Sequence, residues 1–185
     1  CPSMCKCAPE EIIQCNRAGL RALPGEIAAS TVSLNLSNNY LRILTTNTFR
    51  NLTFLHSLWL DGNNLTFLSP GTFHALSKRR NSRLTYLHAN TFRGLLNLIS
   101  LDLSHCNIFE IHPLLFSHLP SLERLNLASN NMRYVPQAFR NLSSLTRLNL
   151  YLNNNQISSI SASAFSYLNK LHFLHLSKNN LSSLP

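Results

Sequence analysis

Residues 31–44 read TVSLNLSNNYLRIL and residues 55–68 read LHSLWLDGNNLTFL, and the same template returns further along the chain. It reads LISLDLSHCNIFEI at 98–111, LERLNLASNNMRYV at 122–135 and LHFLHLSKNNLSSL at 171–184. The apolar residue at its eleventh position can be followed through seven units: Leu41, Leu65, Leu84, Ile108, Met132, Ile157 and Leu181. These residues are 24, 19, 24, 24, 25 and 24 apart, so one structural unit repeats along the chain.

Each unit contains a Leu-x-Leu step that predicts a short strand. Alternate residues of a strand face opposite sides, so the two leucines face inward and their neighbours face outward. One strand cannot bury its own apolar side, and stacked units are therefore expected to share a core and a parallel sheet. Phenylalanines that recur on the far side of the unit are expected to stack as an apolar spine: Phe49, Phe73, Phe92, Phe116, Phe139 and Phe165.

The ninth position of the unit is polar and lies where the chain turns inward. We expect buried amides there to satisfy backbone groups of neighbouring coils. They belong to Asn39, Asn63, Asn130 and Asn179. Cys106 occupies this position in its own unit, and we interpret it as a free structural thiol rather than a reactive one.

The other cysteines, Cys1, Cys5, Cys7 and Cys15, crowd the start of the chain. A dense, even-numbered cluster indicates disulfides formed in an oxidising compartment. Zinc binding is the alternative interpretation, but the spacing C-x3-C-x-C-x7-C lacks paired C-x2-C arms and no histidine lies nearby. Four cysteines permit three pairings, and the spacing alone does not choose one.

The units resemble the leucine-rich-repeat family, whose consensus accepts Asn or Cys at the ninth position. CPSMCKCAPEEIIQC, followed by LRALPGEI, resembles the cysteine-rich N-terminal cap of extracellular members. The resemblance implies a solenoid with a curved parallel β-sheet on its concave face, an irregular or short helical convex side, and a disulfide-bonded N-terminal cap. It places the cap at residues 1–30, with the disulfides Cys1–Cys7 and Cys5–Cys15, and about seven repeats at residues 31–185.

Within that family, RNSRLTYLHANTFRGL (80–95) followed by LISLDLSHCNIFEI resembles the Nogo-receptor and nyctalopin group. This narrower resemblance implies a neural setting. No cysteine-rich C-terminal cap follows the last repeat, and the chain is interpreted as a fragment of a longer ectodomain.

The repeat is irregular in its third and sixth units. ALSKRRNSRL (75–84) lacks a strand motif and its unit is short, whereas LTRLNLYLNNNQI (145–157) is overlong and offers two strand registers. The strand leucines are Leu148 and Leu150 in one register and Leu150 and Leu152 in the other. Losing a strand from the middle of a parallel sheet would leave backbone groups of both neighbours unpaired. We therefore expect residues to be missing at both places, with genuinely irregular coils as the alternative.

Outward positions of the strands are the candidate binding surface. With Leu148 and Leu150 as the strand leucines of the sixth unit, the residues between the strand leucines are Asn35, Trp59, Asp102, Asn126, Asn149 and His175. Exposed aromatic and arginine side chains are typical of interface anchors. The residues predicted to bind a partner protein are Trp59, Asp61, Asp102, Arg124, Arg147, Tyr151, Phe173 and His175. The alternative is that a concave sheet tolerates any polar residue and that Trp59 packs sideways.

Five Asn-x-Ser/Thr sequons are predicted glycosylation sites, at Asn35, Asn51, Asn64, Asn141 and Asn180. Asn51 and Asn141 are expected at the far end of their coils, and Asn64 and Asn180 near the edge of the sheet. A glycan on Asn35 would obstruct the N-terminal end of the concave face and leave the C-terminal part open.

Charge adds a second class of partner. Sixteen Lys and Arg residues against seven Asp and Glu give a formal net charge of +9, which favours acidic partners. Lys78, Arg79, Arg80 and Arg83 form a basic run outside the predicted strands. Such a run is usually a solvated loop; the sharper hypothesis is a site for heparan sulfate or another polyanion.

The sequence offers no recognisable catalytic or cofactor site. It contains no G-x-S-x-G or H-E-x-x-H motif and no phosphate-binding glycine loop, so we expect no enzyme activity, cofactor or metal. It also lacks an apolar run of about 18 residues that could span a membrane.

The predicted function is a protein-binding ectodomain of a cell-surface or secreted recognition or adhesion receptor. Its location would be extracellular, with any membrane anchor outside this chain. A structural matrix protein that binds collagen or proteoglycan is the alternative. An immune sensor that binds nucleic acid ranks last, because aromatic residues suited to base stacking are not interleaved with the basic ones.

Overall fold

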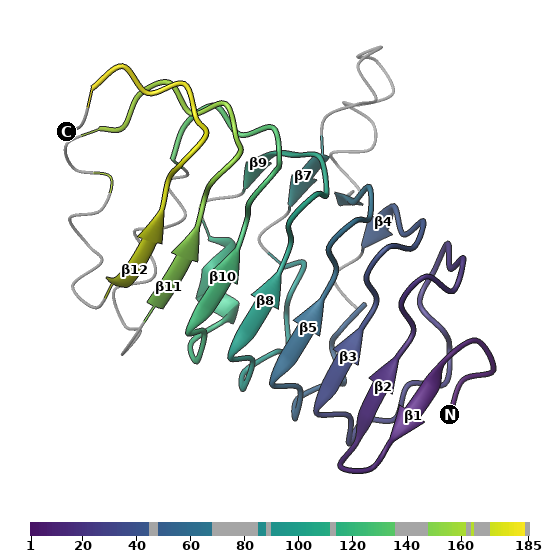
Figure 1. The fold of residues 1–185 in the computed structure, drawn as a ribbon. Coiled ribbons are helices and arrows are strands. Elements are labelled where there is room, and N and C mark those ends of the chain that lie inside the picture. The colour runs from purple at the N-terminus through teal and green to yellow at the C-terminus, as the bar shows by residue number, and fades with distance from the viewer. Residues whose placement is uncertain are drawn as a thin grey trace.

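The computed structural model describes residues 1–44, 48–67, 85–87, 90–111, 114–135, 148–161, 164 and 171–183. Its main strands lie side by side in a curved row, and the two ends of the chain lie at opposite ends of that row (Figure 1). The row begins with β1 (Lys6–Ala8) and ends with β12 (Leu171–His175). The predicted solenoid of stacked coils with a curved, mostly parallel sheet is confirmed.

Within the described residues the main sheet has eight strands, in the order β1-β2-β3-β5-β8-β10-β11-β12. The pair β1–β2 is antiparallel, and every later pair is parallel. The inner strands are β2 (Ile12–Gln14), β3 (Ser33–Asn35), β5 (Ser57–Trp59), β8 (Ser100–Asp102), β10 (Arg124–Asn126) and β11 (Leu148–Tyr151). Smaller parallel pairs are β4 (Ile43–Leu44) with β6 (Thr66–Phe67) and β7 (Thr85–Leu87) with β9 (Ile108–Ile111). One short 3-10 helix, η1 (Leu115–His118), follows β9.

Inward-facing leucines form one continuous core across the coils. The central strand leucine is fully or almost fully buried in each inner coil of the main sheet: Leu34, Leu58, Leu101, Leu125 and Leu150. Phe49, Phe92 and Phe116 are buried on the opposite side of the coils, and the rings of Phe49 and Phe92 stack with their centroids 6.0 Å apart. This part of the predicted spine is confirmed; Phe73, Phe139 and Phe165 lie outside the described residues.

The irregular third unit contributes no strand to the main sheet within the described residues. Instead β5 pairs directly with β8, with Ser57 opposite Ser100 and Trp59 opposite Asp102. The expectation that both neighbours would be left unpaired is therefore wrong, because the two strands close the gap by bonding to each other. The unit still supplies β7, which pairs with β9 in a separate small sheet. The segment 75–84 lies outside the described residues.

The sixth unit adopts the second of its two registers. Arg124 lies opposite Asn149, and Asn126 lies opposite Tyr151, so Leu150 and Leu152 are the strand leucines. The expectation that Asn149 stands between the strand leucines is therefore wrong, and Tyr151 takes that place. Leu148 is also buried, and the register shifts beside it where β11 meets β12. The irregularity lies on the β12 side, where His172 is the extra residue between the partners of Leu148 and Asn149.

Buried asparagine amides connect successive coils. The Oδ1 of Asn130 accepts hydrogen bonds from the backbone N–H groups of Cys106 and Ile108, and its Nδ2 donates to the carbonyls of Leu103 and Leu127. The same bonding across coils recurs, confirming the predicted role, at Asn39, Asn63 and Asn179. Asn155 plays this role in the sixth coil. The sequence pattern did not identify it, because the extra length of the sixth unit obscured its ninth position.

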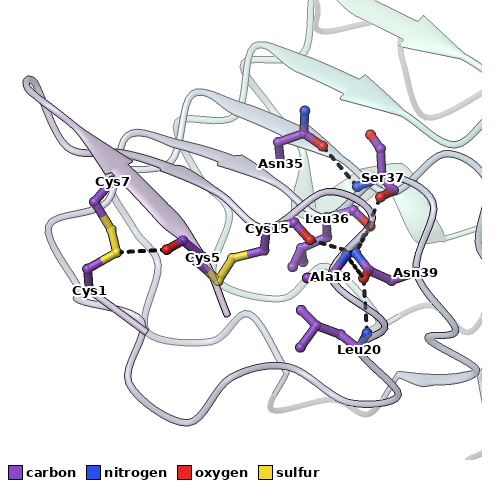
Figure 2. Close-up of a disulfide and its surroundings, with 10 residues drawn as sticks. All are labelled: Cys1, Cys5, Cys7, Cys15, Ala18, Leu20, Asn35, Leu36, Ser37 and Asn39. Atoms are coloured by element: carbon purple, nitrogen blue, oxygen red, sulfur yellow. Dashed lines mark hydrogen bonds between the residues drawn. A yellow bond between two sulfur atoms is a disulfide. The ribbon is translucent and has the colours of Figure 1, made fainter. Parts of the chain in front are cut away.

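The N-terminal cap is closed by two disulfides and is joined to the first coil by hydrogen bonds (Figure 2). Its disulfides are Cys1–Cys7 and Cys5–Cys15, as the family resemblance implies. Asn39 of the first coil donates from Nδ2 to the carbonyl of Cys15, and its Oδ1 accepts from the N–H groups of Ala18 and Leu20. Because Cys15 and Ile13 are buried, the cap covers the edge of the leucine core.

Candidate binding face

Outward side chains of the parallel strands form two rows across the concave face. The first row, between the strand leucines, consists of Asn35, Trp59, Asp102, Asn126, Tyr151 and His175. The second row, two residues earlier in each strand, consists of Ser33, Ser57, Ser100, Arg124, Asn149 and Phe173. Arg147, which the sequence predicted to bind a partner, lies outside the described residues, and Asn149 is the second-row residue of β11.

The C-terminal half of this face carries four side chains in mutual contact, which we call the aromatic–arginine cluster: Arg124, Tyr151, Phe173 and His175. The guanidinium carbon of Arg124 lies 4.9 Å from the centre of the Tyr151 ring. The Tyr151 and Phe173 rings are 5.2 Å apart, and each lies 6.3 Å from the His175 ring. The cluster thus brings together side chains from three strands, β10, β11 and β12, that are far apart in the sequence.

The cluster combines rigidity with exposure. A cation over an aromatic face and edge-to-face ring pairs are attractive arrangements, so each side chain limits the rotamers of its neighbours. Phe173 nevertheless keeps 46% of its surface exposed to solvent. An exposed ring held by its neighbours can be buried by a partner with little further loss of side-chain freedom.

The N-terminal half of the face is polar, and its carboxylates already have partners. The Oδ1 of Asp102 accepts hydrogen bonds from the backbone N–H and hydroxyl of Ser104, and its Oδ2 accepts from Nδ2 of Asn126 at 3.3 Å. Asp61 accepts from the hydroxyl of Ser37. Trp59 is half-buried in the first row beside Asp102. The structure thus places Trp59, Asp61 and Asp102 on the predicted face, but not in contact with the cluster.

Charge is distributed unevenly along the chain. Glu123 is its last acidic residue, and the basic residues beyond it are Arg124, Arg133, Arg140, Arg147, Lys170 and Lys178. The aromatic–arginine cluster therefore lies in the part of the chain that carries only positive formal charge. Asp102 of the first row and Asp61, which follows Trp59 by two residues, lie on the other half.

The predicted glycosylation sites are spread over several surfaces. Asn35 lies in the first row of the concave face, where its Oδ1 accepts a hydrogen bond from the N–H of Ser37. Asn51, Asn64 and Asn180 are exposed and lie outside the main strands. Asn141 and the basic run Lys78, Arg79, Arg80 and Arg83 lie outside the described residues.

Cys106 is a buried free thiol that takes the place of an asparagine. It donates to the carbonyls of Leu60 and Ser104 at 3.0 and 3.4 Å. Burial raises the pKa of the Cys106 thiol from 9.0 to about 12, so the thiol stays protonated and unreactive at neutral pH. In the part of the chain that the structure describes, no group of three His, Cys, Asp or Glu side chains is arranged to hold a metal ion, and no helix is long and apolar enough to cross a membrane.

Comparison with known protein families identifies the repeated coils. A family model described as a leucine-rich repeat matches residues 29–78, 79–132 and 97–151, and a second model of the same description matches 144–168. The chain belongs to the leucine-rich-repeat family.

Several leucine-rich-repeat relatives cover most of the chain. The human leucine-rich repeats and immunoglobulin-like domains protein 1 is 33% identical over 100% of this chain, which spans 15% of that protein. Mouse nyctalopin is 34% identical over 75% of the chain and 31% of its own length. Mouse podocan is 30% identical over 98% of the chain and 34% of its own length. The chain therefore spans only about a third or less of these relatives.

A solved leucine-rich-repeat structure has the same fold. The crystal structure of a TLR13–ssRNA13 complex superposes with a TM-score of 0.63 at 29% identity, covering 89% of this chain and 24% of that one. The similarity to nyctalopin, and to the human reticulon-4 receptor-like 2 at 34% identity over 60% of the chain, agrees with the resemblance that residues 80–111 carry.

Proposed function

We propose that this leucine-rich-repeat chain is a protein-binding part of an extracellular recognition or adhesion receptor, and that its ligand docks on the C-terminal half of the concave face. The observation that carries the proposal is the aromatic–arginine cluster, in which Arg124 packs on Tyr151 while Phe173 remains 46% exposed. Tyrosine, arginine and other aromatic residues are the side chains that most often dominate the binding energy of protein interfaces.

The N-terminal half of the face is less suited to docking. Asn35 belongs to a sequon and points from the concave surface, so a glycan there would cover its neighbourhood. The carboxylates of Asp61 and Asp102 are already hydrogen-bonded within the protein, and a partner would have to compete for them. Both features direct a ligand toward β10, β11 and β12.

The ligand is expected to present acidic groups beside apolar ones. Arg124 packs on the half-buried Tyr151 ring beside the exposed Phe173, and no acidic residue follows Glu123 in the sequence to balance the basic ones. Like-charge repulsion would disfavour a basic partner at this half of the face, whereas its positive charge would attract and orient an acidic partner.

The basic run Lys78, Arg79, Arg80 and Arg83 is a second proposed contact, for an acidic glycan such as heparan sulfate.

An extracellular location fits the two disulfides of the cap, which form in oxidising compartments. A receptor of neural cells is the finer proposal, supported by the similarity to nyctalopin and to reticulon-4 receptor-like 2. A matrix protein is the second candidate, because podocan is similar over almost the whole chain. The two candidates share the concave docking face and differ in what the rest of the protein does.

The proposal is tested by screening the glycosylated chain against cell-surface and matrix ectodomains and then measuring affinity for whatever binds. Arg124→Ala and Tyr151→Ala should each weaken binding about tenfold or more, as expected for anchor residues worth more than 1 kcal/mol. Far-UV circular dichroism should show that the variants stay folded. Unchanged affinity in both folded variants would exclude the cluster as the docking site.

A further inference from the structure

A pocket lies beyond the ends of the sheet strands, among the loops that follow β3, β5 and β8. It has a volume of about 540 Å³ and is lined by Asn39, Tyr40, Arg42, Gly62, Asn63, Asn64, His105 and Asn107. This volume falls within the roughly 300–1,000 Å³ of typical small-ligand sites. The concave rows of the candidate binding face do not contribute to its lining.

The skipped third strand explains why the loops meet here. Because β5 pairs directly with β8, the loop of Gly62 lies against the loop of His105, and the N–H of Gly62 donates to the carbonyl of Ser104 at 3.1 Å. Gly62 has a φ of +72° and no side chain, whereas His105 stands at the equivalent position of its own coil. The absent side chain of Gly62 makes room for the Asn38 side chain of the preceding coil, and the loops of both residues contribute to the wall of the pocket.

One lining residue is also a potential attachment point. Asn64-Leu65-Thr66 is a sequon in which the Asn64 side chain is exposed while Leu65 is fully buried. A sugar joined to Asn64 would begin at the wall of the pocket. We propose that Asn64 carries an N-linked glycan whose first N-acetylglucosamine is seated in this pocket. The proposal rests on the extracellular function proposed above, because N-glycosylation requires passage through the secretory pathway.

The attachment is a group transfer from a lipid-linked oligosaccharide pyrophosphate. The Nδ2 atom of Asn64 forms a bond to the anomeric carbon of the first N-acetylglucosamine. The bond from that carbon to the pyrophosphate oxygen breaks, and the lipid pyrophosphate leaves with the electron pair. Nδ2 gives up one proton, and the product is a neutral glycosyl amide, so no oxidant or reductant is required.

The lining matches the chemistry of a neutral amino sugar. Tyr40 is 67% exposed, and its ring offers a flat apolar surface for the C–H face of a pyranose. Arg42 and the Nδ2 of Asn107 carry N–H donors for the hydroxyl and acetamide oxygens, whereas the Oδ1 of Asn107 already accepts from the Nδ2 of Asn131. The covalent link holds the sugar at high effective concentration, so individually weak contacts suffice to keep it in place.

The chain contains a matched control. Asn51-Leu52-Thr53 repeats the same tripeptide, with an exposed asparagine and a buried leucine, but Asn51 does not line this pocket. A glycan on Asn51 would share the general effects of glycosylation on solubility and folding. Only the glycan on Asn64 should add contacts with Tyr40.

The experiment uses the whole chain secreted from animal cells that make only high-mannose glycans. Peptide mass spectrometry measures occupancy at Asn51 and Asn64, and thermal unfolding measures Tm before and after endoglycosidase H, which leaves one N-acetylglucosamine. Asn64 should be occupied, and trimming should leave Tm unchanged. Asn64→Gln should lower Tm by about 2–4 °C, the shift expected for a modest loss in a domain of this size, and Asn51→Gln should lower it by less.

The variant Tyr40→Ala tests whether the sugar is seated in the pocket. It should lower Tm in the glycosylated chain and have a smaller effect in the Asn64→Gln background, because its sugar contact is then already absent. An unoccupied Asn64 in a chain with both disulfides formed would overturn the proposal while leaving the extracellular function intact. Equal effects of Tyr40→Ala in the two backgrounds would overturn the seating of the sugar.

Discussion

Cys106 occupies an asparagine position with a much weaker hydrogen-bonding group. Its thiol donates to Leu60 and Ser104, but it cannot reproduce the two strong donors of an amide. The sequence pattern correctly predicted a structural thiol, because the residue stands in register with Asn63 and Asn130. The raised pKa follows from complete burial, which opposes formation of the thiolate.

We predict that the stability difference between the native chain and Cys106→Asn depends on pH. The unfolded thiol ionises near 9.0 and the folded one near 12, so the protonated thiol favours the folded state and this contribution is complete below pH 9. Above pH 9, unfolding releases a proton, and the native chain should lose about 1.4 kcal/mol per pH unit relative to the variant. Urea unfolding at pH 8 and pH 10 measures this, and a difference that stays constant would contradict the assignment.

Glycines at positive φ provide a graded test of backbone packing. A Cβ on Gly94 (φ +99°) would lie 2.5 Å from the backbone oxygen of Arg50, which cannot swing aside. A Cβ on Gly62 (φ +72°) would instead meet the side-chain oxygen of Asn38, which can move. Gly62→Ala should cost about 1–2 kcal/mol for its left-handed backbone, and Gly94→Ala should cost more. Gly25→Ala, which meets nothing within 4 Å, should stay within about 0.5 kcal/mol in the same urea titration.

At the scale of the coils, one buried amide links a turn of chain to the preceding one in each described coil of the main sheet except that of Cys106. Asn130 fixes the coil of β10 to that of β8 through donors and acceptors at once. Asn130→Asp keeps the acceptor, loses the donor and buries a carboxyl group. Each buried carbonyl left without a partner costs about 1–3 kcal/mol, so a loss of at least about 2 kcal/mol is expected by chemical denaturation. Asn16→Asp, at an exposed position, is the control. An equal loss of stability in the two variants would contradict the role of the Asn130 amide in joining the coils.

Coils that keep the repeat length could be predicted from sequence, and coils that change it could not. The burial of Leu34, Leu58 and Leu101 follows from their spacing alone, because in these units only one strand register turns all the leucines inward. In the sixth unit, however, Leu148, Leu150 and Leu152 are all buried, so hydrophobic pattern gives two equally good registers. The choice depends on pairing with β10 and β12, which is information from neighbouring coils rather than from the unit itself.

At the scale of the whole molecule, the sequence predicted a curved sheet with a row of outward-facing side chains. It did not predict which of these side chains contact one another. Trp59, Tyr151 and Phe173 all stand out as exposed aromatic candidates in the sequence. Only the observed register places Tyr151 between Arg124 and Phe173 in adjacent strands. The pairing of β5 with β8 was equally inaccessible, since the sequence shows a missing strand but not how the sheet closes over it.

The central claim, that a partner docks on the C-terminal half of the concave face, is tested most directly by hydroxyl-radical footprinting of the chain with and without the partner found by screening. Tyr151, Phe173 and His175 should lose reactivity in the complex, because their rings would be covered. Phe54, which is 61% exposed but lies outside the strands of the main sheet, should keep its reactivity. Protection of Phe54 with an unchanged Tyr151 and Phe173 would show that the partner binds elsewhere.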